Sequence, residues 1–415
     1  MNRLAHAPRW KAGPRFALAA AGILAATSAL AGTPPPGAFA TGRYRDLFAE
    51  DLGRSDAEVD AKIQAAWQQL FYGNDDTQRV YYPVAGDMAY VADILHNDVR
   101  TEGLSYGMMI AVQLNRQADF NRIWKWANVH LYHASGPFAG YFAWHARYDG
   151  TPIHAGPAPD GEEWFVMSLF FAAHRWGNGE GIFNYEHEAQ TILHTMIHKG
   201  DGGDGLVTSM FDRAARQVVF VPQARGSQFT DPSYHLPAFY ELWARWAADP
   251  ADRAFLAGLA PVSRELFRHA ANPRTGLMPD YANFDGTPHR AWGHEDFRFD
   301  AYRTLSNVAL DYAWFAQDPW AVEQSNRVLA FLRSQGPHCA NQFALDGHPL
   351  SDRSSPGLPA MAAVAALAAD SADGPYFVRN LWAMDIPSGS ERYYDGLLYF
   401  LALLEVSGHF RIHGP

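Results

Sequence analysis

The chain has 415 residues, of which 48% are hydrophobic and 19% charged, a composition typical of a globular enzyme and not of a disordered or fibrous protein. Its formal net charge is −11. An acidic protein repels phosphate backbones and polyanionic polymers such as pectin, so nucleic acids and acidic polysaccharides are excluded as expected partners.

The first 31 residues have the pattern of a secretory signal peptide. Small residues at 29 and 31 match a cleavage site, and an Ala-rich apolar stretch over 16–30 follows four basic residues: Arg3, Arg9, Lys11 and Arg15. The stretch is too short to span a bilayer comfortably. We therefore expect cleavage after residue 31, export to the periplasm or the medium, no remaining membrane anchor, and a net charge of −15. The alternative is a cytoplasmic protein whose start codon is assigned too far upstream.

Residues 32–42 are rich in Pro and Gly and are expected to form a flexible leader. After them, apolar residues recur at helical spacing and predict about a dozen helices. We expect these helices near residues 59–70, 104–114, 163–176, 187–198, 235–247, 252–269, 301–316, 319–334, 356–369, 374–382 and 394–406. The only alternating pattern typical of a strand is over 218–221.

Serial helix pairs of this number, with long Gly- and aromatic-rich connections, favour an all-α fold in which hairpins close into an α/α barrel. Catalytic residues would then collect in the loops at one end. An open α-solenoid is the alternative, although no fixed-period repeat is visible. No linker interrupts the chain after residue 42, so residues 43–415 are predicted to be one domain.

Cysteine and histidine usage bounds the chemistry. Cys339 is the only cysteine, so an internal disulfide is excluded and stability must come from a large packed core. A lone cysteine cannot build a zinc site, and the sequence contains no HExxH motif. A catalytic metal is therefore not expected.

Glu102 is the acidic residue with the most distinctive context. It follows Arg100 and Thr101, and its own segment becomes apolar at once with Met108, Met109 and Ile110. Burial at the start of a helix would raise the pKa of its carboxyl group, which a general acid requires. The alternative is a glutamate that only favours the helix dipole.

Asp160 and Asp300 also precede expected helices. Asp160 lies between Pro159 and Gly161, where an N-cap is the simplest interpretation. Asp300 lies among aromatic residues and close to Arg303, and a nearby positive charge would keep its carboxylate ionised, as a general base requires. The alternative is again a cap, with a salt bridge to Arg303.

Taken together, the acidic motifs resemble those of glycoside hydrolase family 8. The three motifs are residues 100–107 (RTEGLSYG), 159–163 (PDGEE) and 299–303 (FDAYR). The runs 231–241, 281–288, 355–358 and 392–399 resemble the branch of this family that releases xylose from reducing ends of xylo-oligosaccharides. The resemblance runs in order from about residue 43 to residue 412.

The resemblance implies an (α/α)6 barrel and an inverting hydrolase that needs no cofactor. Glu102 matches the general acid and Asp300 the general base, while Asp160 matches an acid that holds the sugar in the −1 subsite. Tyr234 matches a tyrosine that helps position the attacking water. In this family, rings line the substrate-binding cleft. The resemblance implies that Trp144, Arg303, Tyr393 and Tyr394 bind the substrate there. The expected partner is a xylo-oligosaccharide, bound by a monomer.

One loop departs from the branch. Its members carry a His just before Ser-Pro-Gly, in a loop that closes the cleft beyond the +1 subsite, whereas this chain has Arg353 and Ser354 there and His348 further back. The loop 345–358 therefore decides between release of xylose from the reducing end and the alternative, an endo-acting β-1,4-glucanase or xylanase of the same family. A binding protein without activity would not need three convergent acids.

Overall fold

The computed structural model describes residues 36–201 and 207–415. The signal peptide predicted over 1–31 lies outside these residues. One compact unit spans residues 35–415. Among the described residues, no helix is both long enough and apolar enough to cross a membrane.

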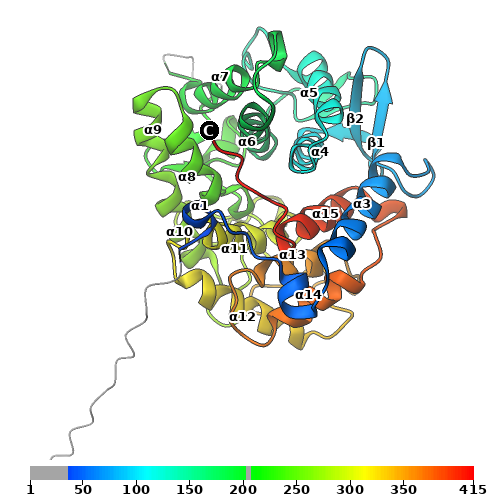
Figure 1. Ribbon diagram of the computed structural model, residues 1–415. Helices are drawn as coiled ribbons and strands as arrows, with labels where there is room; N and C mark the ends of the chain where they lie inside the picture. Colours follow the sequence, from blue (N-terminus) through cyan, green and yellow to red (C-terminus); the bar gives the residue numbers. More distant parts are fainter. Residues whose placement is uncertain (1–35, 202–206) are drawn as a thin grey trace, which may run out of the picture. The chain divides into compact units, whose positions relative to one another are not determined.

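Twelve of the described helices form six antiparallel pairs arranged as two rings (Figure 1). The outer ring comprises α3 (Asp56–Tyr72), α5 (Gln117–Leu131), α7 (Tyr185–His198), α10 (Leu259–Ala270), α12 (Trp320–Ser334) and α14 (Gly374–Ala383). The inner ring comprises α4 (Thr101–Gln113), α6 (Pro159–Trp176), α8 (Pro237–Trp246), α11 (Arg303–Phe315), α13 (Gly357–Ala365) and α15 (Tyr394–Val406). The ring closes because α15 packs on α4, so the expected all-α (α/α)6 barrel is confirmed.

Burial distinguishes the two rings. The inner helices are buried on nearly all sides, as α15 shows with eleven consecutive buried residues from Gly396 to Val406. The outer helices are amphipathic: α10 buries Leu259, Leu266 and Phe267 and exposes its charged face. A helix that is apolar all round must be surrounded by protein, whereas an amphipathic helix covers a core with one face.

Shorter elements complete the barrel. Three short helices are α1 (Ala38–Thr41), α2 (Leu47–Leu52) and α9 (Pro250–Leu256). The 3-10 turns are η1 (Gly181–Phe183), η2 (Ala224–Gln228), η3 (Pro232–Tyr234), η4 (Ala291–Gly293), η5 (Phe299–Tyr302) and η6 (Gly389–Glu391). The expected helix over 252–269 is in fact two helices, α9 and α10, separated at residues 257–258.

The sequence interpretation missed an antiparallel sheet with strand order β1-β2-β3-β4-β5. Its strands are β1 (Tyr81–Val84), β2 (Met88–Asp93), β3 (Asp98–Arg100), β4 (His145–Ala146) and β5 (Pro152–His154). A second, two-stranded sheet pairs β6 (Phe211–Asp212) with β7 (Gln217–Val218), so only the start of the predicted strand over 218–221 is paired. Strands of two to six residues are too short to give a clear alternating pattern.

The helix α5 was not predicted, although Phe120, Ile123, Trp124 and Ala127 are buried at helical spacing. In the described part of the leader predicted over 32–42, Gly37 lies against the backbone of Trp314 and α1 packs on α11. Apolar contact with the barrel outweighs the local Pro/Gly composition.

The C-terminal segment crosses the barrel at the far ends of the inner helices (Figure 1). Its Arg411 backbone exchanges two hydrogen bonds with Gln113 in the last turn of α4. Phe410 is buried against Trp314 of α11 and Trp164 of α6. The segment therefore covers this end of the barrel, and the opposite end, where the inner helices begin, is left to form a cleft.

Candidate active site

The predicted acids lie at the starts of inner helices. Glu102 is the second residue of α4, Asp160 lies in the first turn of α6, and Asp300 lies in η5, which leads into α11. Outer and inner helices alternate along the chain, so every inner helix runs in the same direction. Residues far apart in sequence consequently meet at one end of the barrel.

The five-stranded sheet sets the position of Glu102. Strand β3 ends at Arg100, directly before α4, and pairs with β4 through Val99 and Ala146. The Thr101 N–H donates to the carbonyl of Trp144 at 3.0 Å. The sheet therefore holds Trp144 beside the helix turn that carries the acid.

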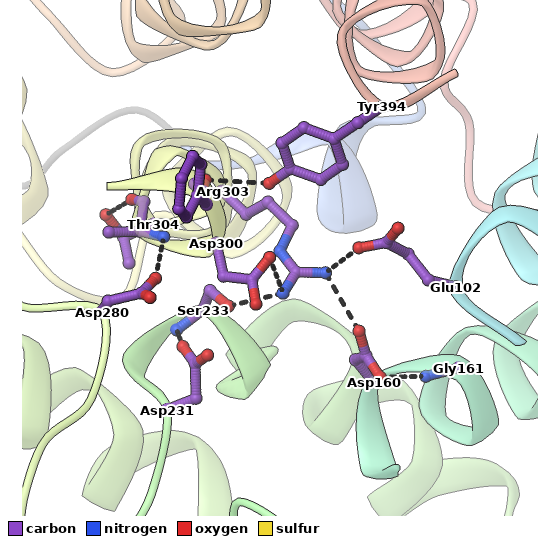
Figure 2. A network of polar contacts seen from close by, with 12 residues as sticks. Glu102, Asp160, Gly161, Asp231, Ser233, Asp280, Asp300, Arg303, Thr304 and Tyr394 are labelled. Atoms are coloured by element: carbon purple, nitrogen blue, oxygen red, sulfur yellow. Dashed lines mark hydrogen bonds and ion pairs between the residues drawn. The ribbon is translucent and has the colours of Figure 1, made fainter. Parts of the chain in front are cut away.

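Arg303 joins the three acids in one network of polar contacts (Figure 2). Its NH1 nitrogen lies 3.1 Å from Asp160 Oδ2 and 3.4 Å from Glu102 Oε2, while NH2 lies 3.1 Å from Asp300 Oδ1. NH1 also donates to the Tyr106 hydroxyl at 2.7 Å. Because the guanidinium is a rigid planar fork, it fixes the three carboxylates relative to one another.

Glu102 is in the environment of a general acid. Its side chain is only 14% exposed, and burial raises the pKa of its carboxyl group to about 8 despite the opposing charge of Arg303. The Tyr393 hydroxyl donates to Glu102 Oε1 at 3.0 Å. Gly103 permits this approach, because a Cβ at that position would lie 2.4 Å from the Tyr393 ring. The predicted rise in pKa is therefore confirmed.

Asp160 is not a helix cap. The N-cap residue of α6 is Ala158, and Asp160 uses Oδ1 to accept the Gly161 N–H at 2.8 Å and Oδ2 to contact Arg303. Burial raises the pKa of the Asp160 carboxyl, and the Arg303 guanidinium opposes that rise.

Asp300 also makes no cap hydrogen bond, and its side chain is the most exposed of the three acids at 29%. Asp231, Asp280 and Asp300 each bring one carboxylate oxygen to within 4.8 Å of the others. Burial, followed by the charge of Asp300, raises the pKa values of Asp231 and Asp280 well above their usual range. Asp231 accepts the Ser233 N–H at 2.7 Å, and Asp280 accepts the Ala301 N–H at 3.1 Å. Two buried acids, Asp231 and Asp280, and one guanidinium thus surround Asp300, the predicted base.

The sequence interpretation missed Asp231 and Asp280 as parts of the site. Asp231 opens one of the motif runs, and Asp280 directly precedes another, which begins at Tyr281. Those runs were the available signal, but their side chains meet Asp300 only through the closure of the barrel.

A cleft of about 710 Å3 opens above the acids. Its lining combines the acids Glu102, Asp160 and Asp300 with the rings of Trp144, Phe220, Tyr234, Tyr281 and Trp292, among other residues. This volume and mixture are typical of a small-molecule site, with apolar faces and a few convergent polar groups. Trp292 was not predicted; it is 69% exposed and has a φ of 53°, an uncommon backbone conformation for a large residue that functional sites tolerate.

Tyr234 and Trp144 line the cleft as predicted, but three other predicted substrate-binding residues do not. Arg303 is buried, and the contacts described above occupy its NH1 and NH2 nitrogens with protein groups. Tyr393 is buried on Glu102, and the Tyr394 hydroxyl donates to the Phe299 carbonyl at 2.9 Å. Sequence alone could not separate a ring that faces the sugar from a ring that supports the acid. No described residue of the loop 345–358 lines the cleft either.

Comparisons with known proteins agree on one family. The family described as "Glycosyl hydrolases family 8" matches residues 90–408. The reducing-end xylose-releasing exo-oligoxylanase of Paenibacillus barcinonensis is 44% identical over 382 residues, which cover 91% of this chain and 98% of the relative. The corresponding enzyme of Halalkalibacterium halodurans is 44% identical over 383 residues, covering 91% and 97%. A solved family 8 xylobiose complex from Teredinibacter turnerae is 47% identical, with a TM-score of 0.88, and covers 91% of this chain and 100% of that one.

Proposed function

The chain belongs to glycoside hydrolase family 8, and we propose that it releases xylose from the reducing ends of short β-1,4-linked xylo-oligosaccharides, with inversion at the anomeric carbon. The observation that carries this proposal is the convergence of Glu102, Asp160 and Asp300 on one buried guanidinium beneath a ring-lined cleft. Its relatives at 39–44% identity are exo-oligoxylanases.

The environments of the two principal acids support their proposed roles. Glu102, whose pKa is about 8, keeps its proton at neutral pH and gives it to the leaving glycosidic oxygen. Asp300, the more exposed acid beside Arg303, accepts a proton from the attacking water. Inversion requires that water to fit between the base and the sugar, with carboxyl groups roughly 6.5–9.5 Å apart. Glu102 contacts the NH1 nitrogen of Arg303 and Asp300 contacts its NH2 nitrogen, which keeps the two acids separate.

Asp160 and Tyr234 complete the site. Both line the cleft. Asp160 is positioned to accept hydrogen bonds from hydroxyl groups of the sugar in the −1 subsite. Tyr234, whose ring lies 5.5 Å from the Arg303 guanidinium carbon, is positioned to orient the water.

We further propose that the mature protein acts as a monomer outside the cytoplasm, in a periplasm or the medium. The N-terminal pattern of basic residues followed by an apolar stretch supports export. Mass spectrometry of the protein from its native host would test this: a mature N-terminus at Gly32 is expected, and an intact Met1 in the cytoplasmic fraction would contradict export.

Product analysis on xylotriose and on its borohydride-reduced alditol tests the proposed substrate. We expect xylose and xylobiose from free xylotriose and no cleavage of the alditol, because the enzyme would require the intact reducing-end sugar. NMR spectra of the first products should show the α anomer of xylobiose, the outcome of inversion of a β bond. Glu102→Ala serves as the inactive control.

An endo-acting xylanase is the second candidate, favoured by one observation. The loop 345–358 carries Arg353 and Ser354 where the resembling branch has a His, and none of its described residues lines the cleft. Cleavage of both xylotriose and its alditol, or of long xylan only, would establish the open cleft and overturn the exo mode while leaving the hydrolytic mechanism intact.

A further inference from the structure

A cluster of two imidazoles and a carboxylate lies on the outer ring. His194 and His198 are one turn apart on α7, and their rings stack with centroids 4.2 Å apart. Asp252 lies in the first turn of α9 and faces both of them. His194 Nδ1 is 3.2 Å from Asp252 Oδ2, and His198 Nε2 is 2.6 Å from Asp252 Oδ1. None of the three residues lines the cleft.

The donor atoms have the spacing of a metal site. One ligand atom from each residue lies within 4.8 Å of the other two. Zinc binds imidazole nitrogen and carboxylate oxygen at about 2.0–2.2 Å in tetrahedral geometry, which places neighbouring ligand atoms about 3.4 Å apart. The two contacts with Asp252, at 3.2 and 2.6 Å, are both shorter than that spacing, so the side chains would have to move apart to admit the ion. His194 is 58% exposed, which leaves an approach from solvent and room for water as fourth ligand.

A second shell supports this interpretation. Asp201 Oδ2 lies 3.1 Å from His198 Nδ1, and Arg213 NH2 holds the same Asp201 oxygen at 2.6 Å. A histidine that ligates a metal through one nitrogen usually bonds a carboxylate through the other, which fixes its tautomer and ring orientation. His198 therefore directs Nε2 toward Asp252.

Asp252 is the buried anion of the cluster. Its side chain is only 6% exposed, and the two histidines are its ion-pair partners within the described part of the chain. A buried carboxylate requires positive charge or hydrogen bonds nearby. A divalent ion would supply that charge directly.

From this geometry we propose that His194, His198 and Asp252 bind one Zn²⁺ ion, which links α7 to α9. The site is structural, because it takes no part in the lining of the cleft. Binding expels the proton shared between His198 and Asp252 and forms three coordinate bonds, with no redox change. Ca²⁺ and Mg²⁺ prefer oxygen ligands and do not fit this donor set.

Calorimetric titration of the full chain, free of any histidine tag and treated with EDTA, tests the site with ZnCl2. We expect one ion per chain and a melting temperature that rises with zinc concentration, because the ion binds the folded state. MgCl2 and CaCl2 should leave the melting temperature unchanged. His194→Gln should abolish the stoichiometric site, and Asp201→Asn should weaken it by about 10–100-fold.

His187→Gln is the matched control, because His187 is an exposed histidine on the same helix without a place in the cluster. It should bind zinc as the natural sequence does. Equal binding by the His194→Gln variant, or no stoichiometric binding by the unaltered chain, would show that the cluster is a hydrogen-bonded pair network only. Because His194 is largely exposed, its variant should fold, and the melting temperature without zinc verifies that.

Discussion

Two glutamates, one at the cleft and one inside the barrel, have similarly raised pKa values and different surroundings. Burial raises the pKa of Glu102 to about 8 and that of Glu405 also to about 8. Glu405, near the end of α15, is 4% exposed and accepts a hydrogen bond from Ser306 at 2.9 Å. Glu102 contacts Arg303 and Tyr393 and lines the cleft.

The comparison teaches that a raised pKa does not by itself make a catalytic acid. Both carboxyl groups can keep a proton at neutral pH. Of the two, only Glu102 lines the cleft together with other acids, so in the proposed mechanism only Glu102 can pass its proton to a bound sugar. Burial raises the pKa of both carboxyl groups, whereas the position of each glutamate in the barrel decides whether its proton can reach the cleft.

The largest expected effect is a difference in catalytic rate between variants of the two glutamates. Glu102→Gln should lower kcat on xylotriose by about 10²–10⁴-fold, because the leaving oxygen loses its proton donor. Glu405→Gln, the matched control, should change kcat by less than a few-fold. Steady-state kinetics of the two purified variants measure both values. Similar losses in the two variants would mean that the site described here does not carry the reaction.

Arg303→Met should produce the largest change in stability. It removes the buried cation that Asp160 and Asp300 share and leaves their charges uncompensated, so the free energy of unfolding should fall by about 3–5 kcal/mol. Arg45→Met removes an exposed pair with Glu50 and should cost less than about 1 kcal/mol. Urea unfolding monitored by fluorescence measures both. A small loss in the Arg303 variant would contradict its role as the hub of the acids.

Glu405→Gln should change how the free energy of unfolding depends on pH. The folded state holds the Glu405 proton up to about pH 8, whereas the unfolded chain releases it near pH 4.5. Stability therefore falls as pH rises between these values, by up to about 1.4 kcal/mol per pH unit for this one group. The variant lacks that contribution. The free energy of unfolding of both proteins is measured against pH, and the difference between the two curves is then plotted. A flat difference would show that Glu405 is not the titrating group.

The smallest effect concerns the hydrogen bond that the Tyr393 hydroxyl donates to Glu102. Activity should fall as pH rises through about 8, because Glu102 must be protonated to act. Tyr393→Phe removes a donor that favours the ionised carboxylate, so this basic limb of kcat/KM should move to higher pH. The lost hydrogen bond is worth about 0.5–1.5 kcal/mol. Tyr394→Phe is the control, because that hydroxyl donates to the Phe299 carbonyl and should leave the limb in place.

Local patterns in the sequence determined much of the fold. Apolar spacing identified the inner helices, because a buried helix such as α15 is continuous in its apolar residues. The same spacing existed in α5, where Phe120, Ile123 and Trp124 mark the buried face, but the polar residues between them obscured it. The short strands β4 and β5 have no comparable signal, since they are defined by the pairing of β4 with β3 and of β5 with β4 and not by their own sequence.

The sequence alone identified Glu102, Asp160 and Asp300 as candidate site residues. It also identified the apolar segment that follows and buries Glu102. Only the tertiary structure decided that Arg303 holds all three acids, that Tyr393 supports Glu102 instead of facing a sugar, and that Asp231 and Asp280 surround the base. The physical reason is distance along the chain. Helical periodicity reports which face of one segment is buried, whereas contacts between residues separated by 20 to 300 positions depend on how six hairpins close into a ring.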